Sequence, residues 1–133
     1  MRKFPTHVEN HMNICIIVHM IANQLHNPRP AERLSEEKAA ELAEIFRLMG
    51  DQSRLRIILL CANGPICVGE IAAQLELPQS LVSHHLRLLR ATRILRARRQ
   101  GKQMYYSVAD EHISCVVADM VDHVIESDEE SDE

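Results

Sequence analysis

Four residues of metal-ligand type lie near the end of the chain, on what the apolar period predicts to be one helix. They are Asp110, His112, His123 and Glu126. His112 and His123 are eleven residues apart, which is about three helical turns, so they share a face but lie roughly 16 Å apart along the axis. A zinc–ligand bond is only about 2 Å long. One chain therefore cannot close a metal site with these residues.

A second, antiparallel copy of the helix would bring the four ligands together. The pairs 110/126 and 112/123 have nearly the same midpoint, close to Ala118. A two-fold axis at that point places Asp110 and His112 of one chain beside the partner's His123 and the partner's Glu126. The spacing thus predicts a homodimer and a metal together. The alternative is that His123 and Glu126 form an ordinary solvated pair on an acid-rich helix.

Length and composition bound the class of protein. At 133 residues the chain makes one domain with tails, and a hydrophobic content of 46% is ample for a core. No apolar run approaches the ~20 residues of a membrane span, and no convincing signal-peptide cleavage site is found. The four cysteines form no regular framework: Cys15, Cys61, Cys67 and Cys115. These features indicate a cytoplasmic protein with free thiols and no membrane partner.

The net charge of −4 hides a strong asymmetry. Residues 77–109 hold seven cations and no acid, whereas residues 110–133 hold ten acids and neither Lys nor Arg. A cationic middle of this kind indicates a surface that meets phosphate, which the overall charge conceals.

Hydrophobic period and capping residues predict the elements that carry these side chains. Apolar residues recur at helical spacing between Ser35 and Gly50, and Asp51 can cap a following helix. Two short helices, 67–75 and 79–92, are joined by a tight turn. The second is rich in Ser, His and Arg, which is typical of a helix-turn-helix motif.

After the second of these helices the apolar period changes to two. Segments 94–99 and 103–108 are predicted as strands around a turn at Gly101, and the last helix begins near Asp110. The expected fold is mainly α: a winged helix-turn-helix with about five helices and a two-stranded β-hairpin wing, dimerising through terminal helices. Its parts are an N-terminal arm over 1–34 with a short helix at 14–25, the winged domain over 35–126, and an acidic disordered tail over 127–133.

The predicted helix 79–92 and the hairpin supply side chains that suit DNA. Those on the helix, near its start and on one side, are Gln79, Ser80, Ser83, His84 and Arg87. Gln and Arg can read base edges through paired hydrogen bonds, while Ser and His reach phosphates or bases. On the hairpin, Arg98, Arg99 and Lys102 are predicted to contact phosphate. The alternative for these three is a solvated hairpin.

Several motifs resemble one known family. The most specific are 50–56 (GDQSRLR), 67–72 (CVGEIA), 80–89 (SLVSHHLRLL), 99–102 (RQGK) and 105–107 (YYS). Together with the order of elements over about residues 40–126, they resemble the ArsR/SmtB family of metal-sensing winged-helix repressors. The resemblance implies a homodimer that binds double-stranded operator DNA as the apo-protein and releases it when metal binds.

The resemblance also places Asp110, His112, His123 and Glu126 on the family's four ligand positions between the last helices. Two imidazoles and two carboxylates suit Zn(II), with Co(II) as a spectroscopic substitute. In related proteins a liganding His donates from its other ring nitrogen to a backbone carbonyl just after the recognition helix. Arg93 occupies that position, so the resemblance predicts Arg93 as an allosteric link.

Some members of the family carry a second metal site, in which N-terminal thiols reach the helix before the recognition helix of the other protomer. Cys67 and Glu70 match one half of it, and Cys15 and His19 resemble the N-terminal half. Such a mixed set would accept Zn(II) and softer ions such as Cd(II) or Cu(I). The alternative for Cys67 is a small buried hydrophobe. Gly69 stands where the arsenite-type motif has its second Cys, so arsenite is not expected.

Two positions depart from the family pattern. Pro78 is compatible with a first helical turn. His85 replaces a common Gln and leaves the base preference there open.

Functions of other classes compete with that of a metal-sensing regulator. A zinc hydrolase keeps an open coordination position and a nearby general base. The sequence offers no nucleophile–base pair, so neither enzyme activity nor a small organic substrate is expected. A winged-helix regulator without a metal response and a metal-storage protein also remain open. The sequence names neither the physiological metal, nor the use of the N-terminal cysteine site, nor the operator and its genes.

Overall fold

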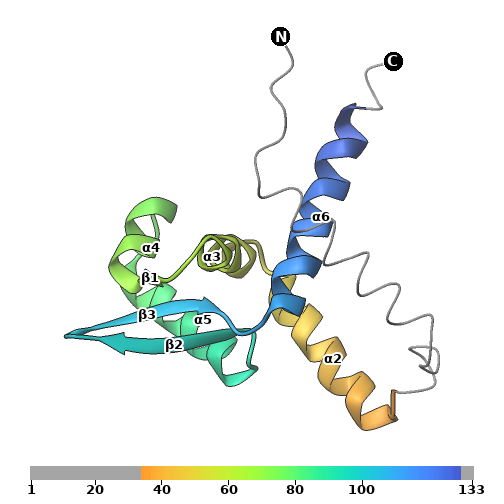
Figure 1. Ribbon diagram of the computed structural model, residues 1–133, viewed down its shortest axis with the longest axis horizontal. Coiled ribbons are helices and arrows are strands. Elements are labelled where there is room, and N and C mark those ends of the chain that lie inside the picture. The colour runs from red at the N-terminus through yellow and green to blue at the C-terminus, as the bar shows by residue number, and fades with distance from the viewer. Residues whose placement is uncertain (1–33, 130–133) are drawn as a thin grey trace. The chain divides into compact units, whose positions relative to one another are not determined.

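The computed structural model describes residues 34–129, and from Glu37 onward they belong to one compact unit. Its elements are α2 (Glu36–Met49), α3 (Gln52–Ala62), β1 (Ile66–Cys67), α4 (Val68–Leu75), α5 (Gln79–Ala91), β2 (Leu95–Gln100), β3 (Gln103–Val108) and α6 (Glu111–Glu129) (Figure 1). The helix expected at 14–25 lies outside the described residues.

The predicted break between α2 and α3 is confirmed. The Gly50 N–H donates to the Phe46 carbonyl at 2.9 Å and closes the last turn of α2. Asp51 then caps α3, because its Oδ1 accepts the Arg54 N–H at 3.0 Å. The Arg54 side chain turns back and donates from Nε to the Leu48 carbonyl at 2.7 Å. The start of α3 is therefore capped by Asp51 and joined to the end of α2 by the hydrogen bond between Arg54 and Leu48.

The helix-turn-helix motif is formed by α4 and α5. The turn between them needs a left-handed residue, and Glu76 takes that conformation with φ 54°. The Leu77 N–H then returns to the Ala72 carbonyl at 3.1 Å and satisfies the end of α4. Pro78, which has no N–H to lose, stands just before the first turn of α5.

The sheet has one strand more than the sequence analysis predicted. Its order is β1-β3-β2, and both neighbouring pairs are antiparallel. In β1, Ile66 pairs with Tyr106 and Cys67 with Tyr105. A strand of two residues shows no alternation, so only its long-range pairing reveals it. The wing is thus the hairpin of β2 and β3, which extends beyond the short third strand (Figure 1).

Within residues 34–129, the helices α3, α4, α5 and α6 pack around one apolar core. The helix α2 contributes to this core only at its C-terminal end. The core members are Leu48, Met49, Ile57, Ile58, Cys61, Ile66, Ile71, Leu75, Val82, Leu86, Leu89, Ile94, Leu95 and Val117. Val117 anchors α6, whose later turns carry exposed residues. Within residues 34–129, no helix combines the length and apolar character needed to cross a membrane.

The last helix continues beyond its expected end. Residues 127–129 belong to α6, and the Ser127 hydroxyl donates to the Val124 carbonyl at 2.8 Å. The predicted boundary at residue 127 therefore falls within the last turns of α6.

Candidate nucleic-acid interface and metal centre

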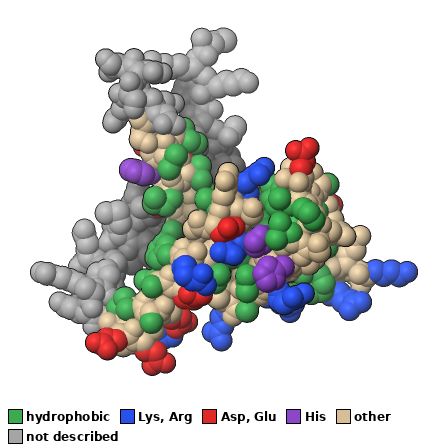
Figure 2. All heavy atoms as spheres, turned by 180° about the vertical axis from the view of Figure 1, so that it is seen from behind, with side chains coloured by type: hydrophobic (Ala, Val, Ile, Leu, Met, Phe, Trp, Pro, Cys, Tyr) green, Lys and Arg blue, Asp and Glu red, His purple; other side chains and the backbone are tan. Residues whose placement is uncertain are grey.

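The helix α5 has one buried and one exposed face. Val82, Leu86 and Leu89 are buried in the core. The residues predicted to meet DNA lie on the other side: Gln79, Ser80, His84 and Arg87 are exposed, and Ser83 is half-buried. Because 80, 84 and 87 follow the helical repeat, these side chains form one polar stripe. In Figure 2, His side chains lie beside Lys and Arg side chains on the surface of this unit.

The hairpin presents its cations to solvent. Arg98, Arg99 and Lys102 are all exposed. Arg98 and Arg99 are neighbours on β2, so they point to opposite faces of the strand, and Arg99 Nε donates to the Gly101 carbonyl at 3.3 Å. Gly101 has φ 61°, a conformation that favours glycine. The tight turn leaves Lys102 at the tip of the wing, where an elongated polyanion can reach it.

The four predicted metal ligands are arranged along α6 as the spacing implies. Asp110 precedes the helix and caps it, its Oδ1 accepting the Ile113 N–H at 3.1 Å. His112 lies in the first turn, and His123 and Glu126 lie toward the far end; all four side chains are exposed. In the part of the chain that the structure describes, no three His, Cys, Asp or Glu side chains come close enough to hold a metal. A single chain leaves the ligand set divided.

Apolar side chains are exposed on the same helix. Val116, Met120 and Val124 are 42%, 55% and 57% exposed, and they follow His112 at intervals of four residues. On α2, Phe46 is 54% exposed. Hydrophobic side chains are accordingly visible on the surface of α6 and α2 in Figure 2. Contiguous exposed apolar patches mark protein or membrane contact sites, ligand grooves or aggregation-prone surfaces, so this stripe is a candidate contact surface.

Comparison with known proteins identifies the family that has this architecture. A family profile described as bacterial regulatory protein, arsR family, matches residues 51–97. The transcriptional repressor SmtB homolog of Synechocystis sp. is 38% identical over 112 residues, which cover 84% of this chain and 83% of that protein. The chain belongs to the ArsR family. This ArsR-family chain is also 34% identical to the cadmium resistance transcriptional regulatory protein CadC homolog of Staphylococcus aureus, over 67% of the chain and 74% of the relative.

Solved structures agree with this assignment. The homodimeric winged helix-turn-helix DNA-binding domain Mb0332 of Mycobacterium bovis superposes with a TM-score of 0.63 and 28% identity, covering 74% of this chain and 94% of that one. The ArsR-family chain is therefore a winged helix-turn-helix regulator of transcription and not an enzyme. The zinc hydrolase and the metal store are both set aside.

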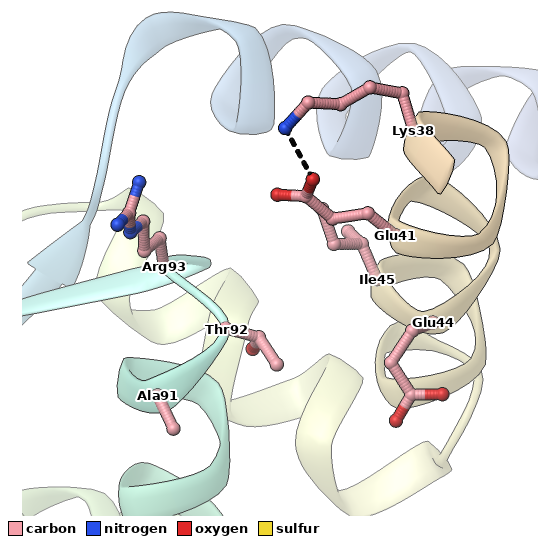
Figure 3. Close-up of a pocket in the computed structure, with 7 residues that line it drawn as sticks. All are labelled: Lys38, Glu41, Glu44, Ile45, Ala91, Thr92 and Arg93. Carbon is pink, nitrogen blue, oxygen red and sulfur yellow. Dashed lines mark hydrogen bonds and ion pairs between the residues drawn. The ribbon is translucent and has the colours of Figure 1, made fainter. Parts of the chain in front are cut away.

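Arg93 lies at the turn between the recognition helix and the wing of this ArsR-family domain. Its backbone is left-handed with φ 60°, and its N–H donates to the Arg90 carbonyl at 3.1 Å. Its side chain lines a pocket of about 420 Å³, across from Lys38 and Glu41 of α2 (Figure 3). The Lys38 ammonium, 2.6 Å from Glu41, lowers the pKa of that carboxyl by hydrogen bond and charge, with a smaller contribution from Arg93. The positive charge of Arg93, at the turn after α5, therefore acts on Glu41 of α2.

The second predicted ligand set is only partly described, because Cys15 and His19 lie outside residues 34–129. Cys67 is the last residue of β1 and the N-cap of α4, one residue before the observed start of the helix that was expected to begin with it. Cys67 is also buried while Glu70 is exposed, because pairing with Tyr105 draws the backbone of Cys67 into the sheet.

Cys61 does not supply a thiol ligand in place of Cys67. Its side chain is buried in the core, and burial raises the pKa of the Cys61 thiol to about 12. The reactive thiolate is therefore not formed at neutral pH.

The sequence did not predict the buried environment of His85. The sequence suggested a role in base preference, yet the side chain is only 7% exposed and faces the core. Its position three residues after Val82 and four before Leu89 places it in the apolar stripe of α5. That spacing indicated a buried position, but the polar type of the side chain led to the prediction of a surface role.

Proposed function

We propose that this ArsR-family protein is a metal-responsive repressor. A homodimer binds operator DNA through α5 and the wing, and Zn(II) binding between the two α6 helices releases the DNA. The observation that carries this proposal is the arrangement on α6, where four exposed ligand-type residues border an exposed apolar stripe. Covering that stripe with an antiparallel α6 of a second chain completes the ligand set.

The donor set fits a tetrahedral zinc site. Asp110 and His112 of one chain would join the partner's His123 and the partner's Glu126, giving two oxygens and two nitrogens. Asp110 also caps α6 through Oδ1, and since a carboxylate has two oxygens, the cap does not prevent ligation.

The DNA-binding surface is divided between reading and positioning. Gln79 and Arg87 on the exposed side of α5 can pair with base edges in the major groove. Arg98, Arg99 and Lys102 on the wing would contact phosphate, which adds affinity without sequence information. In a dimer the two recognition helices would enter successive major grooves, one helical turn of DNA apart.

Release requires that metal favours a dimer shape that binds DNA poorly. A ligand shifts such an equilibrium only by its difference in affinity for the two shapes. Because the proposed site bridges both chains, metal fixes the crossing of the two α6 helices and with it the separation of the two α5 helices. Arg93 is the proposed acceptor, through its backbone carbonyl, of a hydrogen bond from a liganding imidazole.

A titration of DNA affinity against metal tests the proposal. A duplex is first selected from a random pool with the apo-protein, and its binding is then followed by fluorescence anisotropy during addition of Zn(II). We expect wild type to lose affinity, and a His112→Gln/His123→Gln variant to bind the duplex with no response to Zn(II). An Asp119→Asn/Asp122→Asn variant is the matched control, since it alters exposed non-ligand acids of the same helix, and should respond as wild type does.

The outcomes separate the competing mechanisms. Equal release from wild type and the double-His variant would move the metal site elsewhere. Binding that is insensitive to Zn(II), Co(II), Cd(II) and Cu(I) would make the protein a regulator without a metal response. The same titration with Cys15→Ser/Cys67→Ser tests the second ligand set, Cys15, His19, Cys67 and Glu70. A response to Cd(II) or Cu(I) that disappears in this variant would assign those ions to it.

A further inference from the structure

The recognition helix carries a buried polar atom without a hydrogen-bond partner. His85 lies on the core side of α5 and is 7% exposed. Its Nδ1 is buried, and no donor or acceptor among the described residues reaches it. Buried polar groups are almost always paired, so an unpaired one in a functional element calls for an explanation. A buried ring of this kind is least costly when it carries no charge.

Charged groups border the ring on two elements. From the start of α3, Asp51 and Arg54 act on His85 electrostatically, and on α5 itself the His84 ring lies 5.9 Å from it, centroid to centroid. The other elements packed on α5, which are α4 and β2, contribute the apolar Ile71 and Leu95 to the core.

Two hydrogen bonds fix the start of α3. Asp51 Oδ1 accepts the Arg54 N–H at 3.0 Å, and Arg54 Nε donates to the Leu48 carbonyl at 2.7 Å. His85 therefore lies between the recognition helix and the capped end of α3. A new charge there would act on the cap as well as on the ring.

Burial is the largest influence on the ring, and it lowers the pKa of His85; Asp51 opposes this shift, while Arg54 and His84 add to it. The folded domain thus prefers the neutral imidazole. A histidine whose pKa is lower folded than unfolded stabilises the fold fully above its unfolded pKa, near 6.5. That contribution is lost as the pH falls below this value toward the folded pKa.

We propose that His85 is a positioning residue for DNA recognition. Its neutral ring holds α5 in place against the start of α3, and protonation of the ring displaces α5 from this position. The proposal rests on the proposed use of α5 as the reading helix. Ser83, His84 and Arg87 share a turn of helix with His85 and carry the polar stripe. Paired hydrogen bonds to base edges need that turn to be placed to within about 0.5 Å. Base-specific binding should therefore weaken in mild acid.

His84 provides a matched control position. It is the exposed neighbour of His85 on the same helix, so replacing it leaves the buried ring in place. A comparison between variants at the two positions therefore isolates the buried ring.

The test measures affinity for a duplex selected at pH 7.5 by the wild-type apo-protein. Anisotropy titrations at pH 7.5, 6.5 and 5.5, with a chelator present, compare wild type with His85→Gln, a polar side chain of similar reach that cannot be charged. We expect the affinity of wild type relative to His85→Gln to fall at least about threefold between pH 7.5 and 5.5. On a random duplex, where phosphate contacts dominate, the ratio should change less. The control His84→Gln, which retains the buried His85 ring, should keep the fall in affinity seen for wild type.

A ratio that stays constant with pH would overturn the role of His85 and leave DNA binding intact. A wild type that binds no selected duplex at pH 7.5 would instead overturn DNA recognition itself. If His85→Gln does not fold, which circular dichroism would show, NMR titration of the His85 ring protons in wild type decides. A lower His85 pKa in the DNA complex than in the free protein supports the proposal, and equal values contradict it.

Discussion

The backbone of Ile94 joins the end of the recognition helix to Ala109, just before α6. The Ile94 carbonyl accepts the Ala109 N–H at 3.0 Å, and the Ile94 N–H donates to the Leu89 carbonyl of α5 at 3.0 Å. Ile94 is fully buried, so water does not compete for either hydrogen bond. Ala109 stands immediately before the proposed ligand Asp110. The residue before α6 and the end of α5 are therefore linked through the backbone of one buried residue.

This connection predicts that metal binding and DNA release can be separated. In His123→Asn the amide is a poor ligand and does not reproduce the outward-facing ring nitrogen of His123 that would bond the Arg93 carbonyl. We expect this variant to bind Zn(II) weakly and to keep the DNA affinity of the apo-protein even at saturating metal. Anisotropy of a labelled duplex, with zinc occupancy followed by a competing chelator, measures both quantities. If the variant at full zinc occupancy released DNA as completely as wild type does, His123 would have no part in the coupling between metal binding and DNA release.

Asp110 is predicted to have two separable roles. Asn is as good a helix N-cap as Asp, whereas Ala is not. Asp110→Asn should leave the free energy of unfolding within about 0.5 kcal/mol of wild type, while Asp110→Ala should lose about 1 kcal/mol. Both should bind Zn(II) more than about tenfold less tightly, since even the outer partners of metal ligands are worth roughly 10- to 100-fold. Urea unfolding and chelator competition give the two numbers. Undiminished zinc affinity in Asp110→Asn would reduce Asp110 to a cap.

Local signals were sufficient for most of the fold. The apolar repeat before Gly50 and the capping residue Asp51 predicted the break between α2 and α3, and the turn before Pro78 predicted the helix-turn-helix. Glycine at position 101 predicted the hairpin turn. These features depend on residues close in sequence, so a single chain displays them directly.

Features set by distant residues could not be predicted in this way. β1 exists because Ile66 and Cys67 pair with Tyr106 and Tyr105, some forty residues along the chain. The same pairing places Cys67 in β1, directly before α4. The burial of His85 depends on the packing of α5 against α3. Its polar side chain gave no indication of that packing. The spacing on α6 did predict that one chain leaves the four ligands apart, since that follows from the rise of a helix alone.

The exposed stripe on α6 predicts that a charge there breaks the proposed dimer. Met120 is 55% exposed, and Met120→Asp would place two unpaired carboxylates in each dimer interface. We expect dimerisation to weaken on the order of 100-fold, or about 2.8 kcal/mol, in sedimentation equilibrium without metal. Ala73→Asp adds the same charge to an exposed position on α4 and should leave the dimer intact. If both variants dissociated equally, or if neither dissociated, the subunit contact would lie away from this face of α6.

Lys102 at the tip of the wing is predicted to act through phosphate alone. Each phosphate contact releases condensed counterions, so log K falls linearly with log salt concentration, with a slope of about −0.9 per contact on duplex DNA. Lys102→Ala should weaken selected and random duplexes to a similar degree and reduce the slope by about one unit per wing. Anisotropy over a series of salt concentrations measures both. Lys38→Ala removes an exposed cation already paired with Glu41 on α2 and should leave the slope unchanged. A loss confined to the selected duplex would instead make Lys102 a reader of bases, because only sequence-dependent contacts distinguish the two duplexes.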